Sequence, residues 1–412
     1  MYRYILSFIA GRGALFLGPI FLANFMSAID YGRIEAALAS ATLLSSLATL
    51  GTASLVPLTL LGHPTSARTL GIFAHHLLFS GISIAIAIFI WIFHGPSQWL
   101  YVAVIASGVS LQGLASIQLK TLGHSNGSVL TDAGLLGLMS ISAVLAFLIA
   151  PNYAMLFVIG AAAIYSLVLF AYYLKISCKD FARDANVEWL KTIQAGIPLM
   201  LGGIASALAT TSGRLGMAVM AEPSMTANYS VLARAATLPI IAYQLIVVAK
   251  FRDIFTQPEA EVEKTSARIL ILVFVSAIVI MATAPYAGFL IGSFFEHALR
   301  NNRFEFNLIL SQSIIWAAIA LNDLQITRHQ GMAKVLPYTA GFLALSLMAA
   351  FTSLPKPIPS LGPYITAHSI VMLAFYSTQT LIMLRIGIKS ISIFATTCAC
   401  YFLLIIGSNI FR

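Results

Sequence analysis

Residues 269–291 read ILILVFVSAIVIMATAPYAGFLI and contain no charged side chain, and Lys264 and Arg268 stand just before them. About twenty apolar residues in a helix span the hydrocarbon core of a bilayer, so this run is long enough to cross a membrane. Further runs of similar length lie on both sides of it along the chain. The chain is therefore expected to cross the bilayer many times.

The apolar runs predict an all-α polytopic membrane protein with 12–13 transmembrane helices. Hydrophobic residues make up 59% of the 412 residues and charged residues 9%, far from the balance of a soluble domain. The runs lack the period-two alternation of a transmembrane barrel, so helices are favoured. The expected helices cover residues 4–27, 36–61, 71–93, 98–117, 129–150, 153–174, 193–217, 227–249, 269–291, 304–325, 335–354, 359–383 and 390–411.

The 23 Lys and Arg residues divide unevenly between alternate gaps of this map. One set of gaps holds Arg3, Arg68, Lys120, Lys175, Lys179, Arg183, Lys191, Lys250, Arg252, Lys264, Arg268, Arg328, Lys334, Arg385 and Lys389. The opposite set holds Arg33, Arg300, Arg303, Lys356 and Arg412. The positive-inside rule places the richer set and the N-terminus in the cytoplasm. The C-terminus is outside if the last run spans, and inside if two late runs share one crossing.

The formal charge of +9 is explained by this topology, because most of the excess lies beside helix ends, where it meets the anionic headgroups of membrane lipids. No nucleic-acid partner is therefore expected. Cys398 and Cys400 are two apart on one helix and point to different faces, so they do not form a compact metal pair. The sequence predicts no metal site and no cofactor.

Two six-helix lobes are predicted, with an N-terminal lobe and its cytoplasmic linker in residues 1–190 and a C-terminal lobe in residues 191–384. Residues 385–412 are expected to form one additional transmembrane helix. Residues 14–20 (ALFLGPI) and 198–204 (PLMLGGI) are identical at four of seven positions, and each run lies in the first helix of its half. Six helices return the chain to its starting side, so such repeats would have parallel topology.

Arg12, Arg214 and Arg234 lie inside apolar runs. Arg12 is about 12 Å along the first helix at 1.5 Å per residue. A guanidinium at a helix centre costs about 2.5–3.5 kcal/mol on insertion scales, so these side chains are not expected to face lipid at depth. They need carboxylates, backbone carbonyls, water or an anionic ligand as partners.

Acidic partners for these arginines are scarce, because all 14 Asp and Glu residues fall in loops or near the ends of the expected helices. Asp132 and Asp323, for example, are expected near the cytoplasmic face. Unmatched cations imply a wet, electropositive interior that suits a phosphate or diphosphate, which arginine holds by bidentate hydrogen bonds. Arg12, Arg234 and Arg214 are therefore the predicted substrate-binding residues. The alternative is that the guanidinium groups snorkel to the headgroups.

His368 is the deepest of three histidines within apolar runs and is a candidate for ion coupling, because an imidazole titrates near neutral pH. A hydrogen-bonded packing histidine is the simpler interpretation. Five amide side chains either line a sugar-accepting cavity or form hydrogen bonds between helices. These are Gln112, Gln118, Gln244, Asn322 and Gln379.

Several short patterns resemble one family of membrane proteins. Gly11-Arg12-Gly13, an apolar stretch and Asp30-Tyr31-Gly32 are similar to the opening of Wzx-type flippases, which belong to the multidrug/oligosaccharidyl-lipid/polysaccharide exporter (MOP) superfamily. The run at 118–124 (QLKTLGH) resembles the basic end of their fourth helix. Three further patterns resemble the start of their second lobe: Gly196-Ile197-Pro198-Leu199, Asn228-Tyr229-Ser230 and Ala233-Arg234-Ala235.

The resemblance implies two lobes around a central cavity in a bacterial inner membrane. It implies transport of undecaprenyl-diphosphate-linked oligosaccharide to the outer leaflet by alternating access, in O-antigen (lipopolysaccharide) or other polysaccharide biosynthesis, alongside polysaccharide polymerase machinery. The diphosphate would then meet the arginines, with Arg12 and Arg234 the best candidates. The family is thought to couple transport to an ion gradient, whereas this sequence shows no obvious mid-membrane carboxylate.

Two alternatives remain open from the sequence. A MATE-like exporter of drugs or metabolites would have this architecture, but export of cations needs acidic residues in the cavity. A membrane polysaccharide polymerase or glycosyltransferase needs a sizeable outer loop or an acidic metal-binding cluster. The outer connections are short, and no G-x-x-x-x-G-K-[ST] loop for ATP is present, so a transporter rather than an enzyme is expected.

Overall fold

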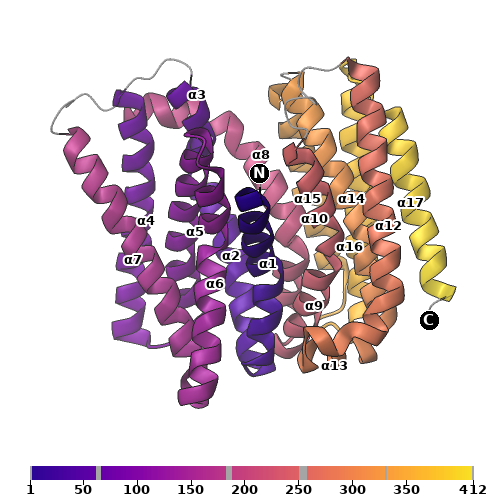
Figure 1. Cartoon of the computed structure of the whole chain (residues 1–412), viewed down its shortest axis with the longest axis horizontal. Coiled ribbons are helices and arrows are strands. Elements are labelled where there is room, and N and C mark those ends of the chain that lie inside the picture. The colour runs from indigo at the N-terminus through magenta and orange to yellow at the C-terminus, as the bar shows by residue number, and fades with distance from the viewer. Residues whose placement is uncertain (1, 62–65, 182–187, 250–257, 330–331, 411–412) are drawn as a thin grey trace. The chain divides into compact units, whose positions relative to one another are not determined.

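The computed structural model describes residues 2–61, 66–181, 188–249, 258–329 and 332–410. The described residues form helices and their connections, and none of them lies in a strand (Figure 1). Packing divides the chain into two compact units, which we name lobe 1 (Met1–Ala207) and lobe 2 (Leu208–Arg412). Among the basic residues used for the topology, Arg183, Lys250, Arg252 and Arg412 lie outside the described residues.

Each lobe is a bundle of helices. Lobe 1 contains α1 (Tyr2–Asn24), α2 (Ala28–Ala48), α3 (Val56–Leu61), α4 (Ser66–His94), α5 (Gln98–Thr121), α6 (Ser125–Ile149) and α7 (Ala154–Phe181). Helix α8 (Trp189–Met220) begins in lobe 1 and ends in lobe 2. Lobe 2 continues with α9 (Pro223–Ala236), α10 (Leu238–Ala249), α12 (Glu259–Ile291), α13 (Ser293–Asn301), α14 (Arg303–Arg328), α15 (Met332–Ser353), α16 (Leu361–Arg385) and α17 (Ile391–Ile410).

By length and composition, ten of the described helices can cross a membrane, or eleven if α8, which bends by 53° at Pro198, is counted as one span. This confirms the prediction of an all-α polytopic membrane protein. Residues 391–408 of α17 form one of these candidate spans, in the segment where an additional helix was expected.

The same packing pattern recurs in both lobes. In lobe 1, α5 contacts α2, α4, α6 and α7, and in lobe 2, α14 contacts α9, α12, α15 and α16. Each is the most buried candidate span of its lobe, with 78% and 72% of the apolar window buried against 50% or less for the other candidate spans. Helix α17 has no counterpart in lobe 1 and packs on α12 and α14.

The second helix of each lobe is interrupted. Helix α2 ends at Ala48, the chain turns through positive φ at Leu50 and Gly51, and α3 follows. Helix α9 ends at Ala236, and after Thr237 the chain continues as α10. One continuous helix was expected over residues 36–61 and another over residues 227–249, and both expectations are wrong. Breaks at matching positions of two repeats are typical of transporter folds.

Helix α2 also begins earlier than expected. The Ser27 hydroxyl accepts a hydrogen bond of 3.1 Å from the Asp30 backbone N–H, which caps a helix that starts at Ala28 rather than at residue 36. Glu35 therefore lies inside α2, where it is fully buried and accepts a hydrogen bond from the Tyr31 hydroxyl at 3.1 Å. Because the helix was expected to begin at residue 36, Glu35 was expected outside it.

Candidate functional site

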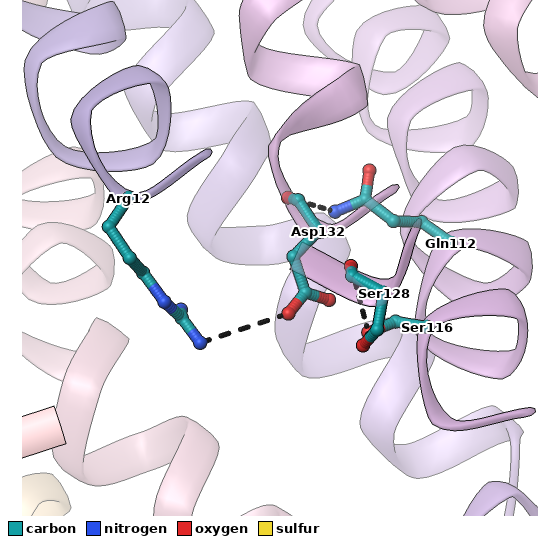
Figure 2. Close-up of polar contacts among 5 residues, drawn as sticks. All are labelled: Arg12, Gln112, Ser116, Ser128 and Asp132. Carbon is teal, nitrogen blue, oxygen red and sulfur yellow. Dashed lines mark hydrogen bonds and ion pairs between the residues drawn. The ribbon is translucent and has the colours of Figure 1, made fainter. Parts of the chain in front are cut away.

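Close packing of α1 on α6 positions the first candidate residue, Arg12. A Cβ at Gly11 would lie 2.5 Å from Val129 Cγ1 and 2.8 Å from the Val129 carbonyl oxygen, so only glycine allows this approach. One helical heptad further on, the Ser140 hydroxyl donates a hydrogen bond of 2.9 Å to the Gly18 carbonyl. The two glycines share a face of α1, and the Arg12 side chain extends from beside this face toward α6 (Figure 2).

Arg12 and Asp132 form an ion pair that joins α1 to α6. The Arg12 Nη2 atom lies 3.9 Å from Asp132 Oδ2, a separation that exceeds hydrogen-bond length (Figure 2). Their side chains are 17% and 30% exposed. The Arg12 Nε atom is buried and has no hydrogen-bond partner in the described part of the chain, and the guanidinium carbon lies 5.7 Å from the centre of the Phe8 ring. The guanidinium therefore makes only a weak ionic contact with Asp132, and its Nε–H donor makes no hydrogen bond to the described residues.

The position of Asp132 is fixed from α5. The Gln112 amide donates a hydrogen bond of 2.7 Å to the Asp132 carbonyl, and its oxygen accepts one of 3.2 Å from the Leu135 N–H. The Ser116 and Ser128 hydroxyls are 2.9 Å apart one turn away (Figure 2). The backbone that carries the carboxylate is therefore held on the side away from Arg12.

The expectation that no acidic side chain pairs with Arg12 is wrong, because Asp132 does so. It lies two turns inside α6, within a candidate membrane span, because α6 already begins at Ser125. Asp323 likewise lies inside α14, where its Oδ1 atom accepts a hydrogen bond of 2.8 Å from the Gln379 amide. Asp132 was not selected from the sequence, because the helix expected at residues 129–150 begins about one turn earlier in the structure, at Ser125.

The other two arginines belong to lobe 2. Arg214 lies in α8 and follows Gly213, whose lack of a Cβ leaves room for the Tyr229 hydroxyl of α9. Arg234 lies in the last turn of α9, just before the break at Thr237, whose hydroxyl donates to the Arg234 carbonyl at 2.7 Å. A cation is favourable at a helix C-terminus because the carbonyl ends of the peptide dipoles gather there.

The structure thus brings Asp132 to Arg12. Arg12 belongs to lobe 1, whereas Arg214 and Arg234 belong to lobe 2. Tyr229 and Tyr31 are both fully or almost fully buried, and each lies near the start of the interrupted helix of its lobe.

His368 lies in a buried polar cluster of lobe 2. Its side chain is 1% exposed, with Nε2 3.0 Å from the Ser212 hydroxyl of α8 and Nδ1 3.2 Å from the Gln312 Oε1 atom of α14. The Gln312 amide donates to Ser369 at 2.7 Å, which directs its oxygen toward the imidazole. Because that oxygen only accepts, Nδ1 carries the proton and Nε2 accepts from Ser212. Tyr364 stacks on the imidazole, with ring centres 6.2 Å apart.

Most of the amide side chains join helices. Gln112 binds α6, Gln118 accepts a hydrogen bond of 2.8 Å from the Tyr173 hydroxyl, and Asn322 donates to Gln379 at 3.2 Å. These contacts match the second of the two uses expected from the sequence. Gln244 Oε1 is buried and has no hydrogen-bond partner among the described residues. Among these residues, no group of three or more His, Cys, Asp or Glu side chains is arranged to hold a metal ion.

Comparison with solved structures identifies the fold. One similar structure is titled "Lipid II flippase MurJ, inward closed conformation", with a TM-score of 0.62, 12% identity, and coverage of 98% of this chain and 92% of that one. Another is an inward-facing multidrug resistance MATE family transporter of the MOP superfamily, with a TM-score of 0.57, 13% identity, and coverage of 97% and 95%. No family model and no curated protein sequence matches the chain. The chain therefore has a fold similar to that of these two solved structures.

Proposed function

We propose that this chain is a flippase that moves undecaprenyl-diphosphate-linked oligosaccharide across the bacterial inner membrane, for O-antigen or other polysaccharide biosynthesis. The observation that carries the proposal is the Arg12 guanidinium, which lies within a candidate membrane span. Its carboxylate partner is 3.9 Å away, and its Nε atom is buried without a hydrogen-bond partner in the described chain.

The chemistry of Arg12 favours a diphosphate as the ligand. A guanidinium binds phosphate oxygens through two parallel hydrogen bonds of about 2.7–2.9 Å, which are shorter and stronger than the present contact with Asp132. An anion that approaches Arg12 can therefore displace a weak partner. Asp132 meanwhile makes the resting cation tolerable at membrane depth, because it reduces the cost of the unpaired charge.

Arg234 and Arg214 are the proposed partners of the substrate in lobe 2. The similar fold of a protein titled a lipid II flippase supports a lipid-linked cargo. In this proposal the N-terminus is cytoplasmic, and the two six-helix segments expected from the sequence, residues 1–190 and 191–384, alternate between inward-open and outward-open states, with residues 385–412 as an additional helix. The polysaccharide polymerase machinery would act on the delivered product.

His368 is the proposed ion-coupling residue. It is the centre of hydrogen bonds that join α8, α14 and α16, so a change in its protonation would alter contacts of three helices at once. Replacing His368 by Gln keeps a polar side chain of similar size. Transport that loses its dependence on a pH gradient would support coupling, whereas unchanged dependence would leave His368 as a packing residue only.

The activity itself is tested by complementation. A strain that lacks its own flippase is expected to regain surface polysaccharide when it expresses this chain, and to lose it again with Arg12→Ala or Arg234→Ala at equal membrane levels. Failure of the wild-type chain in strains with several different oligosaccharides would contradict the proposal. Full export by both arginine variants would contradict the assignment of the site.

A MATE-like exporter of organic cations is the second candidate. Glu35 and Asp132 lie within helices of lobe 1, so this lobe does contain acids of the kind that cation export requires. The fold of the MATE transporter is also similar. Proteoliposomes loaded with a cationic dye distinguish the two: dye export driven by a proton or sodium gradient, without movement of a lipid-linked oligosaccharide, would favour the exporter.

A further inference from the structure

Lobe 2 contains a groove that the proposed transport does not use. It has a volume of about 330 Å³ and lies between the second half of α8 and the second half of α15. On α8 it is lined by Leu208, Ser212, Leu215 and Val219, which share one helical face. Leu347 and Phe351 are among the residues that line it on α15.

The walls of this groove offer almost no free polar group. Ser212 is engaged with His368 at 3.0 Å, and the Thr352 hydroxyl donates to the Met348 carbonyl at 2.9 Å. Val219 and Met348 are 77% and 61% exposed, so the apolar surface continues out of the groove. In a membrane-spanning helix such a surface meets hydrocarbon chains.

One end of the groove is charged. Of the residues that line it, Lys356 alone carries a charge, and its side chain belongs to the exposed connection between α15 and α16. The connection is fixed over the end of α8, because the Ile358 N–H donates to the Met220 carbonyl at 3.2 Å and the Ile358 side chain is 3% exposed. Candidate spans end at Met220 and at Ser353, so Lys356 lies at the level of the headgroups.

The depth of the groove matches one leaflet. From Val219 to Leu208 the helix rises about 16 Å at 1.5 Å per residue, which is close to half of a hydrocarbon core of about 30 Å. A single acyl chain fits this depth, whereas the chain of an eleven-isoprene carrier lipid exceeds it when extended. The charge at the mouth complements an anionic phosphate.

We propose that the α8–α15 groove, with Lys356 at its mouth, is a binding site for an anionic glycerophospholipid of one leaflet. Its phosphate pairs with the Lys356 ammonium group and one acyl chain lies along Leu215, Leu208 and Leu347. The site lies within lobe 2 and does not depend on the identity of the transported substrate.

Native mass spectrometry of the full-length protein, stripped of lipid in detergent, tests the site with phosphatidylglycerol and phosphatidylcholine of identical chains. Phosphatidylglycerol is expected to bind more tightly. Lys356→Ala is expected to weaken its binding about fivefold, the effect of one lysine near a headgroup. Lys389→Ala, an exposed loop lysine of the same lobe, serves as the control and is expected to have no effect.

A second pair of variants tests the groove itself. Ala344 lines the groove and is exposed, so Ala344→Trp is expected to fill it and to remove the tightest phosphatidylglycerol site. Ala349→Trp, at an exposed position of α15 outside the lining, is expected to leave that site intact. Equal binding of the two lipids, equal effects of Lys356→Ala and Lys389→Ala, or tighter binding of undecaprenyl phosphate in the groove would each overturn the proposal. Dimerisation that Ala344→Trp abolishes would also overturn it, in favour of a second copy.

Discussion

Helices α5 and α14 occupy the same place in lobe 1 and lobe 2, and their surroundings differ in chemistry. Around α5, the buried histidine is hydrogen-bonded to hydroxyl groups, in the chain Thr52–His76–Ser110. Around α14, the buried histidine is hydrogen-bonded to an amide side chain as well as a hydroxyl, in the chain Ser212–His368–Gln312–Ser369. The same helix pattern therefore supports a loosely paired arginine at the edge of lobe 1 and a tightly bonded histidine within lobe 2. Repetition fixes how the helices pack, while the polar residues determine what each lobe can do.

The largest expected effect separates Arg12 from an arginine of the same lobe with a similar partner. Arg33 lies 3.9 Å from Asp30, the same separation as in the Arg12 pair, but its side chain is 52% exposed. Arg12→Ala is expected to reduce oligosaccharide export at least about 10-fold, because a charge-assisted contact contributes about 1.5–3 kcal/mol. Arg33→Ala is expected to stay within about twofold of wild type. Equal losses of export, measured at equal membrane levels, would remove the distinction between the two arginines.

The second expected effect compares the buried histidines of the two lobes. His368→Phe leaves Ser212 and the Gln312 oxygen without their partner, at about 1–3 kcal/mol for each buried group. His76→Phe in lobe 1 leaves Ser110 without its partner, but Thr52 keeps its hydrogen bond of 2.7 Å to the Thr49 carbonyl. Thermal unfolding in detergent is expected to show the larger loss of stability for His368→Phe. A larger loss of thermal stability for His76→Phe would show that lobe 2 depends less on its buried histidine than lobe 1 does.

A third comparison uses two glycines of the first helices, α1 and α8. Gly11→Ala forces a Cβ against the Val129 side chain and backbone and is expected to lower the free energy of unfolding by about 1–3 kcal/mol. A Cβ at Gly203 meets nothing within 4 Å, so Gly203→Ala is expected to be neutral or slightly stabilising. The two melting temperatures check this directly. Similar values for both variants would mean that α1 does not need its close approach to α6.

The smallest expected effect concerns Glu188 at the start of α8. Its hydrogen bond to Lys191 at 2.7 Å lowers the pKa of the carboxyl group. A lowered pKa gives stability that is present above the pKa of the unfolded chain and is lost as the pH falls through the folded value. The Glu188 side chain is 28% exposed and its lysine partner is 70% exposed, so the pair is screened by solvent, and Glu188→Gln is expected to leave the melting temperature unchanged between pH 5 and 8 within about 1 °C. A clear shift would indicate that this end of α8 is more important for lobe 1 than its exposure suggests.

The fold class could be predicted from the sequence, because it depends on local properties, and a local property also selects Arg12 as a candidate residue. Apolar length gives the spans, and a charge inside an apolar run marks Arg12 wherever its neighbours lie. The position of Asp132 opposite Arg12 depends on the packing of α1 on α6, which no local pattern contains. The breaks after Ala48 and Ala236 were missed because the residues on both sides are apolar enough to continue a helix. Ser27 and Asp30 did contain a usable signal, since a capping residue there places Glu35 inside α2.

The central claim is that Arg12 binds the anionic head of the substrate, and that Asp132 only accompanies it at rest. The most direct test is the initial rate of flipping of undecaprenyl-diphosphate-linked oligosaccharide in proteoliposomes containing Arg12→Gln or Asp132→Asn. Arg12→Gln is expected to abolish flipping. Asp132→Asn is expected to retain it, because the Arg12 guanidinium remains and the carboxylate that competes with the substrate for it is gone. Equal loss in both variants would show that the ion pair serves the structure alone, and flipping by Arg12→Gln at the wild-type rate would contradict the account outright.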